Sequence, residues 1–126
     1  MKTEIKNSEI NVEKRAVYEF GKRRRFVWDA RGTLRGIEYR ATAATKPEAI
    51  AQAKAEIVFL LSAGSFEAGG CAVRPSGFQA WDFLLAGTRC VMCFGAPDLS
   101  AAIARAASDY ADHPDAAEFC RAAAAR

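Results

Sequence analysis

The segment from Phe26 to Leu61 constrains the fold more than any other part of the chain. Apolar and polar side chains alternate from Gly36 to Ala43, with the period of two that a half-buried strand shows. A shorter alternating run starts at Phe26, and the turn signal at residues 31–33 separates the two runs. This pattern predicts two antiparallel strands, because so short a connection cannot cross over a sheet.

A helix follows these strands, and its start carries the strongest local signal in the sequence. Thr45 can accept a hydrogen bond from the N–H of Glu48, and Pro47 loses no helical hydrogen bond in a first turn. Gly64 provides a natural C-terminal cap. The apolar residues of one helical face follow at the expected spacing, and they are Ile50, Ala53, Ile57, Leu60 and Leu61.

The rest of the chain repeats the strand–strand–helix theme. A strand ending near Phe20 makes a tight turn at Gly21 and Lys22 and returns through residues 23–30, and residues 78–86 and 88–94 form a second strand pair. A helix is predicted from Leu99, and a short one from 115 to 125. Shared turn residues in the two halves indicate either a duplicated unit or a reuse of the same turn chemistry.

These elements predict an α+β fold: a single antiparallel sheet of five to six strands, with two main helices on one face and a short C-terminal helix. At 126 residues the chain is expected to form one domain. Its expected parts are a flexible segment (1–9), a first unit (10–61), a Gly/Ser-rich linker (62–70) and a second unit (71–126). The longest apolar run is far below membrane-spanning length and no secretory signal is evident, which predicts a cytoplasmic protein without membrane contact.

Positive charge is concentrated in the first half of the chain. Residues 1–63 hold 13 Lys/Arg and 8 Asp/Glu, whereas residues 64–126 hold 5 and 7. The pattern predicts that the first hairpin binds nucleic acid, a nucleoprotein complex or an acidic protein surface; a charged edge that prevents strand aggregation is the alternative. The candidate binding residues are Lys22, Arg23, Arg24, Arg25, Arg31, Arg35, Arg40 and Lys46.

Aromatic side chains accompany these cations and offer two interpretations. Exposed, they would form a platform on which bases stack. The alternation of the strands places several of them on the face assigned to the helix, so packing in the core is predicted instead. The residues concerned are Tyr18, Phe20, Phe26, Trp28 and Tyr39.

Cys90 and Cys93 have the C-x-x-C spacing of a zinc knuckle, and His113 with Cys120 or Cys71 could complete a tetrahedral set. On a regular strand, however, Cys90 and Cys93 point to opposite faces. The sequence therefore predicts no metal and no other cofactor.

No catalytic arrangement is evident, because His113 is the only histidine and its position before Pro114 is typical of a helix start. The leading hypothesis is a non-enzymatic binding protein whose basic first hairpin docks on nucleic acid or a nucleoprotein complex. The alternative is an inhibitor or adaptor of the mobile-element type, such as an anti-CRISPR or other anti-defence protein, that acts by stoichiometric protein binding. The oligomeric state is left open.

Overall fold

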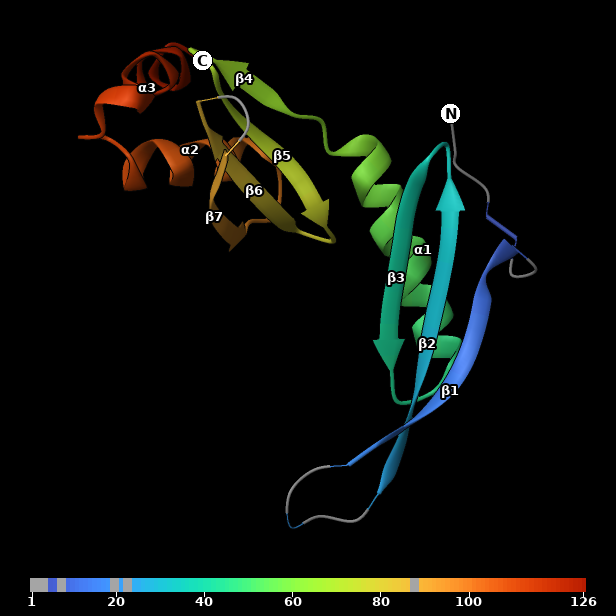
Figure 1. Cartoon of the computed structure of the whole chain (residues 1–126). Helices are drawn as coiled ribbons and strands as arrows, with labels where there is room; N and C mark the ends of the chain where they lie inside the picture. Colours follow the sequence, from blue (N-terminus) through green and yellow to red (C-terminus); the bar gives the residue numbers. More distant parts are fainter. Residues whose placement is uncertain (1–4, 7–8, 19–20, 22–23, 87–88) are drawn as a thin grey trace. The chain divides into compact units, whose positions relative to one another are not determined.

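The computed structural model describes residues 5–6, 9–18, 21, 24–86 and 89–126, which divide into two compact units, residues 1–58 and 59–126 (Figure 1). The predicted α+β class is confirmed. The predicted single sheet is wrong, because the described strands form two antiparallel sheets, β1-β2-β3 and β4-β5-β6-β7. Within each sheet the strands pair in sequence order, and helix α1 separates β3 from β4 along the chain.

The first sheet is a meander of β1 (Asn11–Val17), β2 (Arg25–Leu34) and β3 (Ile37–Ala43). Its second turn is formed by Arg35 and Gly36, both with positive φ, as a two-residue hairpin requires. The turn predicted at residues 31–33 is wrong. Gly32 lies inside β2 opposite Tyr39, and a Cβ there would collide with the Tyr39 ring, so this glycine makes room for packing.

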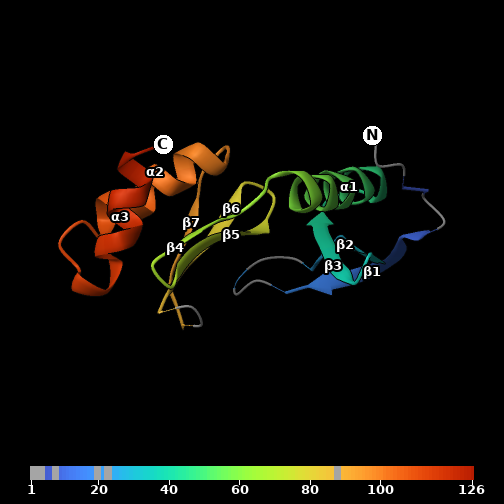
Figure 2. The same ribbon diagram turned by 90° about the horizontal axis from the view of Figure 1, so that it is seen from above.

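Helix α1 (Lys46–Ser62) runs along one face of this sheet (Figures 1 and 2). It begins as predicted, with the Glu48 N–H donating to Thr45 Oγ1 at 3.4 Å. The buried stripe in this unit is Ala49, Ala53 and Ile57, so Ala49 replaces the predicted Ile50, which is only half-buried. The Glu56 carboxylate accepts the backbone N–H of Arg40 at 2.6 Å, which satisfies a donor on the edge strand β3.

The second unit contains a four-stranded meander followed by helices. Its elements are β4 (Phe66–Ala68), β5 (Cys71–Gly77), β6 (Ala80–Leu85), β7 (Arg89–Gly95), α2 (Leu99–Asp109), a 3₁₀ turn at Pro114–Ala116 and α3 (Ala117–Ala124). Strand β4 lies in the segment predicted as a linker. The sequence did not predict this strand because only three of its residues pair and glycine-rich segments lie on either side of it.

The core of the second unit is aromatic and fully enclosed. Trp81, Phe83 and Phe119 are completely buried, and α2 contributes the buried residues Ala102, Ile103 and Ala106. Trp81 Nε1 donates to the carbonyl of Ala96 at 3.0 Å, so the indole is buried without losing its hydrogen bond. No helix in the described part of the chain combines the length and the apolar character needed to cross a bilayer.

Candidate functional site

The first hairpin extends past the rest of its sheet. Strands β1 and β2 pair from Asn11↔Arg31 to Val17↔Arg25, but the pairing of β2 with β3 stops at Trp28↔Ala43. Figure 1 shows this end of the hairpin continuing beyond β3 and beyond the start of α1. We call residues 14–18 and 24–28 the hairpin arm. Its end is covered by neither the third strand nor the helix.

Lys22 and Arg23, the first half of the predicted basic run, lie outside the described residues. Arg24 and Arg25 are exposed on the arm. Lys46, the first residue of α1, places its ammonium 6.0 Å from the Trp28 ring centroid and so lies beside the arm.

The other predicted cations lie elsewhere on the sheet. Arg31 and Arg40 are direct cross-strand neighbours on the face away from α1. Arg35 lies in the β2–β3 turn, at the end of β2 opposite the arm. The described members of the predicted binding set are therefore divided among the arm with the adjoining start of α1, the outer sheet face and the far turn.

The arm exposes aromatic rings between cations. The Tyr18 side chain is 73% exposed and Phe26 is 42% exposed. Lys14 Nζ lies 4.4 Å from the Phe26 ring centroid, and the Arg24 guanidinium carbon lies 4.8 Å from it. Arg24 Nη1 also donates to the Tyr18 hydroxyl at 3.5 Å.

The predicted core packing is thus wrong for Tyr18 and Phe26, because these residues share a face with the helix-packed part of the sheet but lie beyond the helix. The prediction is confirmed for Tyr39, which is 3% exposed, while Trp28 is half-buried. Phe20 lies outside the described residues. Tyr18 and Phe26 are exposed because the hairpin is longer than the part of the sheet that the helix covers. The alternation of side chains along a strand does not show how far a helix covers that strand.

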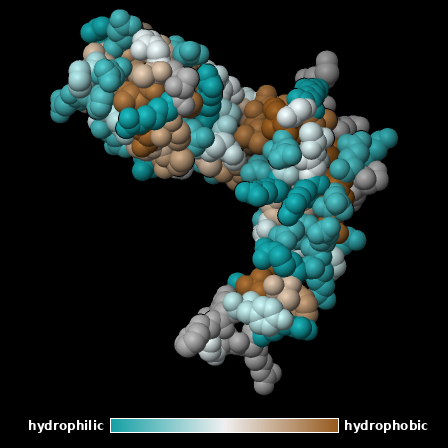
Figure 3. All heavy atoms as spheres, in the orientation of Figure 1, coloured by the Kyte–Doolittle hydropathy of each residue, from teal (hydrophilic) through white to brown (hydrophobic). Residues whose placement is uncertain are grey.

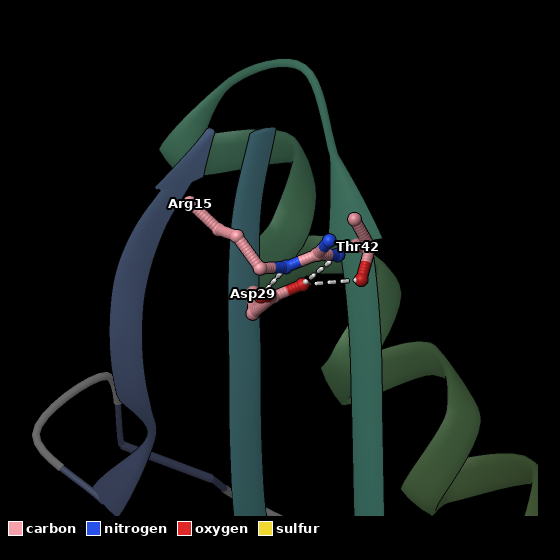
Figure 4. A network of polar contacts seen from close by, with 3 residues as sticks. All are labelled: Arg15, Asp29 and Thr42. Carbon is pink, nitrogen blue, oxygen red and sulfur yellow. Dashed lines mark hydrogen bonds and ion pairs between the residues drawn. The ribbon is translucent and has the colours of Figure 1, made fainter. Parts of the chain in front are cut away.

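The face of the sheet away from α1 carries a polar network that the sequence reasoning missed (Figure 4). Arg15 Nε and Nη2 donate to the Asp29 carboxylate at 2.7 and 3.2 Å, and Thr42 Oγ1 donates to it at 2.6 Å. The Arg15 hydrogen bond, with that from Thr42, lowers the pKa of Asp29 to about 2. Alternation places Asp29 and Thr42 on this face, but their pairing depends on the register.

Arg31 and Arg40 adjoin this network, and together these side chains line a shallow hollow of about 220 Å³. This face is turned toward the viewer in Figure 3, where it is largely hydrophilic. Asp29 neutralises Arg15, and the facing pair Arg31 and Arg40 gives the hollow a positive character.

The cysteines are arranged differently from the prediction. Strand β7 contains a bulge, since Phe83 pairs with Met92 while Leu84 pairs with Cys90, which leaves Val91 as an extra residue. Val91 and Met92 both turn inward, and Cys90 and Cys93 are both exposed, with their sulfur atoms 3.8 Å apart. The predicted opposite orientation is wrong because the strand is not regular.

The four-residue zinc set predicted as a minor possibility is not brought together. His113 Nδ1 accepts the N–H of Asp115 at 3.2 Å and so caps the 3₁₀ turn. Cys120 lies against α2 and donates to the carbonyl of Ala107 at 3.5 Å. Among the described residues, the potential ligand that does join Cys90 and Cys93 is Asp82, which sequence reasoning missed.

Asp82 also affects the chemistry of these thiols. Its hydrogen bond and charge, together with the neighbouring Cys90, raise the pKa of Cys93 to about 11. A thiol with that pKa is protonated at neutral pH, and thiolates rather than thiols are nucleophiles. Cys93 is therefore not activated for nucleophilic chemistry.

Comparisons of the chain with protein-family models, with curated proteins and with solved structures gave no match. The functional assignment therefore rests on the residues and their geometry.

Proposed function

We propose that this is a non-catalytic binding protein whose hairpin arm binds single-stranded nucleic acid. The observation that carries the proposal is the environment of Phe26, an exposed ring over which Lys14 and Arg24 lie at 4.4 and 4.8 Å from its centroid. An incoming base would replace one of these cation–π contacts, and the displaced cation would then be free to contact a phosphate. Proteins that bind single strands combine aromatic faces, on which bases stack, with cations that follow the phosphate backbone. The arm provides both elements on one surface.

The distribution of charge supports the same surface. Residues 1–58 hold 13 Lys/Arg and 8 Asp/Glu, a net +5, while residues 59–126 hold 5 and 7, a net −2. The run Lys22–Arg25 adds four consecutive cations to the sequence of the hairpin. A polyanion would be attracted to the first unit and repelled by the second.

An unpaired strand fits this arm better than a duplex does. In a duplex the bases are stacked inside and offer no free face to Phe26 or Tyr18, whereas an unpaired base can be turned out onto a ring. Unpaired bases can therefore stack on both exposed rings, whereas the paired bases of a duplex cannot.

The experiment is a fluorescence anisotropy titration of a labelled oligothymidylate. Binding should weaken steeply between about 50 and about 200 mM salt, because each phosphate contact on a single strand contributes about −0.7 to the slope of log K against log salt. A flat salt dependence, or binding to a duplex as tight as to the single strand, would overturn the proposal.

Phe26→Leu separates stacking from general apolar contact. Leucine keeps an apolar side chain but has no ring, so the loss of one stacked base should cost about 1–3 kcal/mol of binding free energy. Leu34→Ala, in the same strand but at its far end, is the matched control and should leave binding unchanged.

The same protein tests the alternative of an inhibitor or adaptor. A pulldown from a nuclease-treated lysate would retain a stoichiometric protein partner under that hypothesis. Such a partner, together with the absence of salt-dependent oligonucleotide binding, would favour protein recognition by the basic arm.

A further inference from the structure

The second unit carries three potential metal ligands on one surface, away from its helices. Asp82 on β6 lies directly opposite Cys93 on β7, and the bulge at Val91 returns Cys90 to the face of Cys93. The Sγ atoms and a carboxylate oxygen all lie within 4.8 Å of one another. Without the bulge, Cys90 would point toward the buried core.

The spacing of the two sulfur atoms matches shared ligation. Zinc–sulfur bonds of about 2.3 Å at a tetrahedral angle hold two thiolate sulfurs about 3.8 Å apart. The observed separation of Cys90 and Cys93 is 3.8 Å. A disulfide would need the sulfurs to approach to about 2.05 Å and would leave Asp82 without a role.

The strands beneath hold these ligands in place. Asp82 lies between Trp81 and Phe83, both completely buried, and Cys93 precedes Phe94, which is also buried. Anchored neighbours fix the backbone positions of the ligands, and ligands held by packed elements bind with less loss of entropy. Both thiols are exposed, so a metal ion can reach them from solvent.

We propose that Asp82, Cys90 and Cys93 form a three-ligand site for a thiophilic divalent cation of the Zn²⁺ type, with the fourth position open to water. The cation displaces the protons of both thiols to solvent as it binds, so binding should strengthen as the pH rises. Two sulfurs select a soft or borderline cation over Mg²⁺ or Ca²⁺, which prefer oxygen ligands. Three protein ligands and one open position are the arrangement of accessible zinc centres, whereas closed structural sites use four. The site is independent of the hairpin arm.

The test is a titration of the reduced full-length protein with Co²⁺, followed by displacement with Zn²⁺. A bound Co²⁺ should give one equivalent of thiolate-to-cobalt charge-transfer absorption, and Zn²⁺ should abolish it. Asp82→Asn should weaken Co²⁺ binding at least about tenfold, because loss of even an outer-shell partner typically costs 10–100-fold. Cys93→Ser should remove most of the charge-transfer band.

The controls are Asp112→Asn, an exposed carboxylate of the same unit, and Cys120→Ala, the half-buried thiol against α2. Both should bind Co²⁺ as the unsubstituted protein does. Circular dichroism of each variant checks the fold. Absence of the thiolate band in the reduced protein would overturn the proposal, and so would binding that Asp82→Asn leaves unchanged.

Discussion

The two units cover their sheets to different extents, and this difference decides which aromatic side chains are buried. In the second unit Trp81, Phe83 and Phe119 are completely buried, with Phe59 against Trp81 and Phe119 of α3 against Phe83. In the first unit α1 covers only the part of the sheet that includes β3, and the hairpin arm continues without cover. Trp81, Phe83 and Phe119 stabilise the second unit by burial, whereas Tyr18 and Phe26 of the first unit are exposed beside cations. Phe78 of the second unit is exposed too, at 54%, so what distinguishes the arm is the combination of exposed rings with cations.

The largest expected effect comes from a pair of phenylalanines. Phe83→Ala should lower the free energy of unfolding by about 3–5 kcal/mol, because the ring is fully buried and its loss leaves a cavity. Phe26→Ala should cost about 1 kcal/mol or less, since that ring is half in solvent. Urea denaturation followed by circular dichroism measures both. Equal losses of unfolding free energy in the two variants would contradict the conclusion that Phe83 is buried and Phe26 is exposed.

A glycine pair tests the packing of the first sheet. Gly32→Ala should cost about 1–3 kcal/mol, because the added Cβ meets the buried Tyr39 ring. Gly95→Ala in the second sheet is the control: its nearest neighbour would be the Gln79 carbonyl oxygen at 3.7 Å, an ordinary contact. The same urea titration should show a clearly smaller loss for Gly95→Ala. A mild effect at Gly32 would contradict the packing role of this glycine.

The smallest stability effect concerns Asp29 and its pH dependence. Its pKa in the folded protein is about 2, below the value of about 3.9 for an unfolded chain. The resulting stabilisation is present above pH 4 and is lost as the pH falls toward 2. It should amount to about 1 kcal/mol or less, because Arg15 is largely exposed and its charge is screened.

Asp29→Asn should remove this acid-dependent loss and flatten the stability profile between pH 5 and pH 2 relative to the unsubstituted protein. Asp112→Asn, whose carboxylate lies exposed in the second unit, is the matched control. Thermal denaturation across that pH range measures both variants. If both variants retain the full acid dependence, Asp29 is not the group whose protonation lowers the stability between pH 5 and pH 2.

The sequence was most informative where a signal is local. The start of α1 follows from Thr45 and Pro47, and α2 begins at Leu99 as predicted. The outward position of Arg40 and the inward position of Tyr39 follow from alternation in β3.

Features that depend on partners distant in sequence could not be predicted. The bulge at Val91 exists only in relation to Phe83 and Leu84 on β6, and it reverses the expected orientation of Cys90. The exposure of Phe26 depends on where β3 ends relative to β2. The division into two sheets likewise depends on which strands pair, and the alternation of a single strand does not specify its partner.

Two charge-matched double variants test whether the hairpin arm is the binding surface. Lys14→Ala/Arg24→Ala removes two cations from the hairpin arm, and Arg74→Ala/Arg121→Ala removes two exposed cations from the second unit. The net charge changes equally, so only position differs. The arm variant should reduce the salt slope for oligothymidylate binding by about 1.4, while the second-unit variant should leave it unchanged. Equal effects of the two variants would show that binding depends on overall charge, and would contradict the arm as the binding surface.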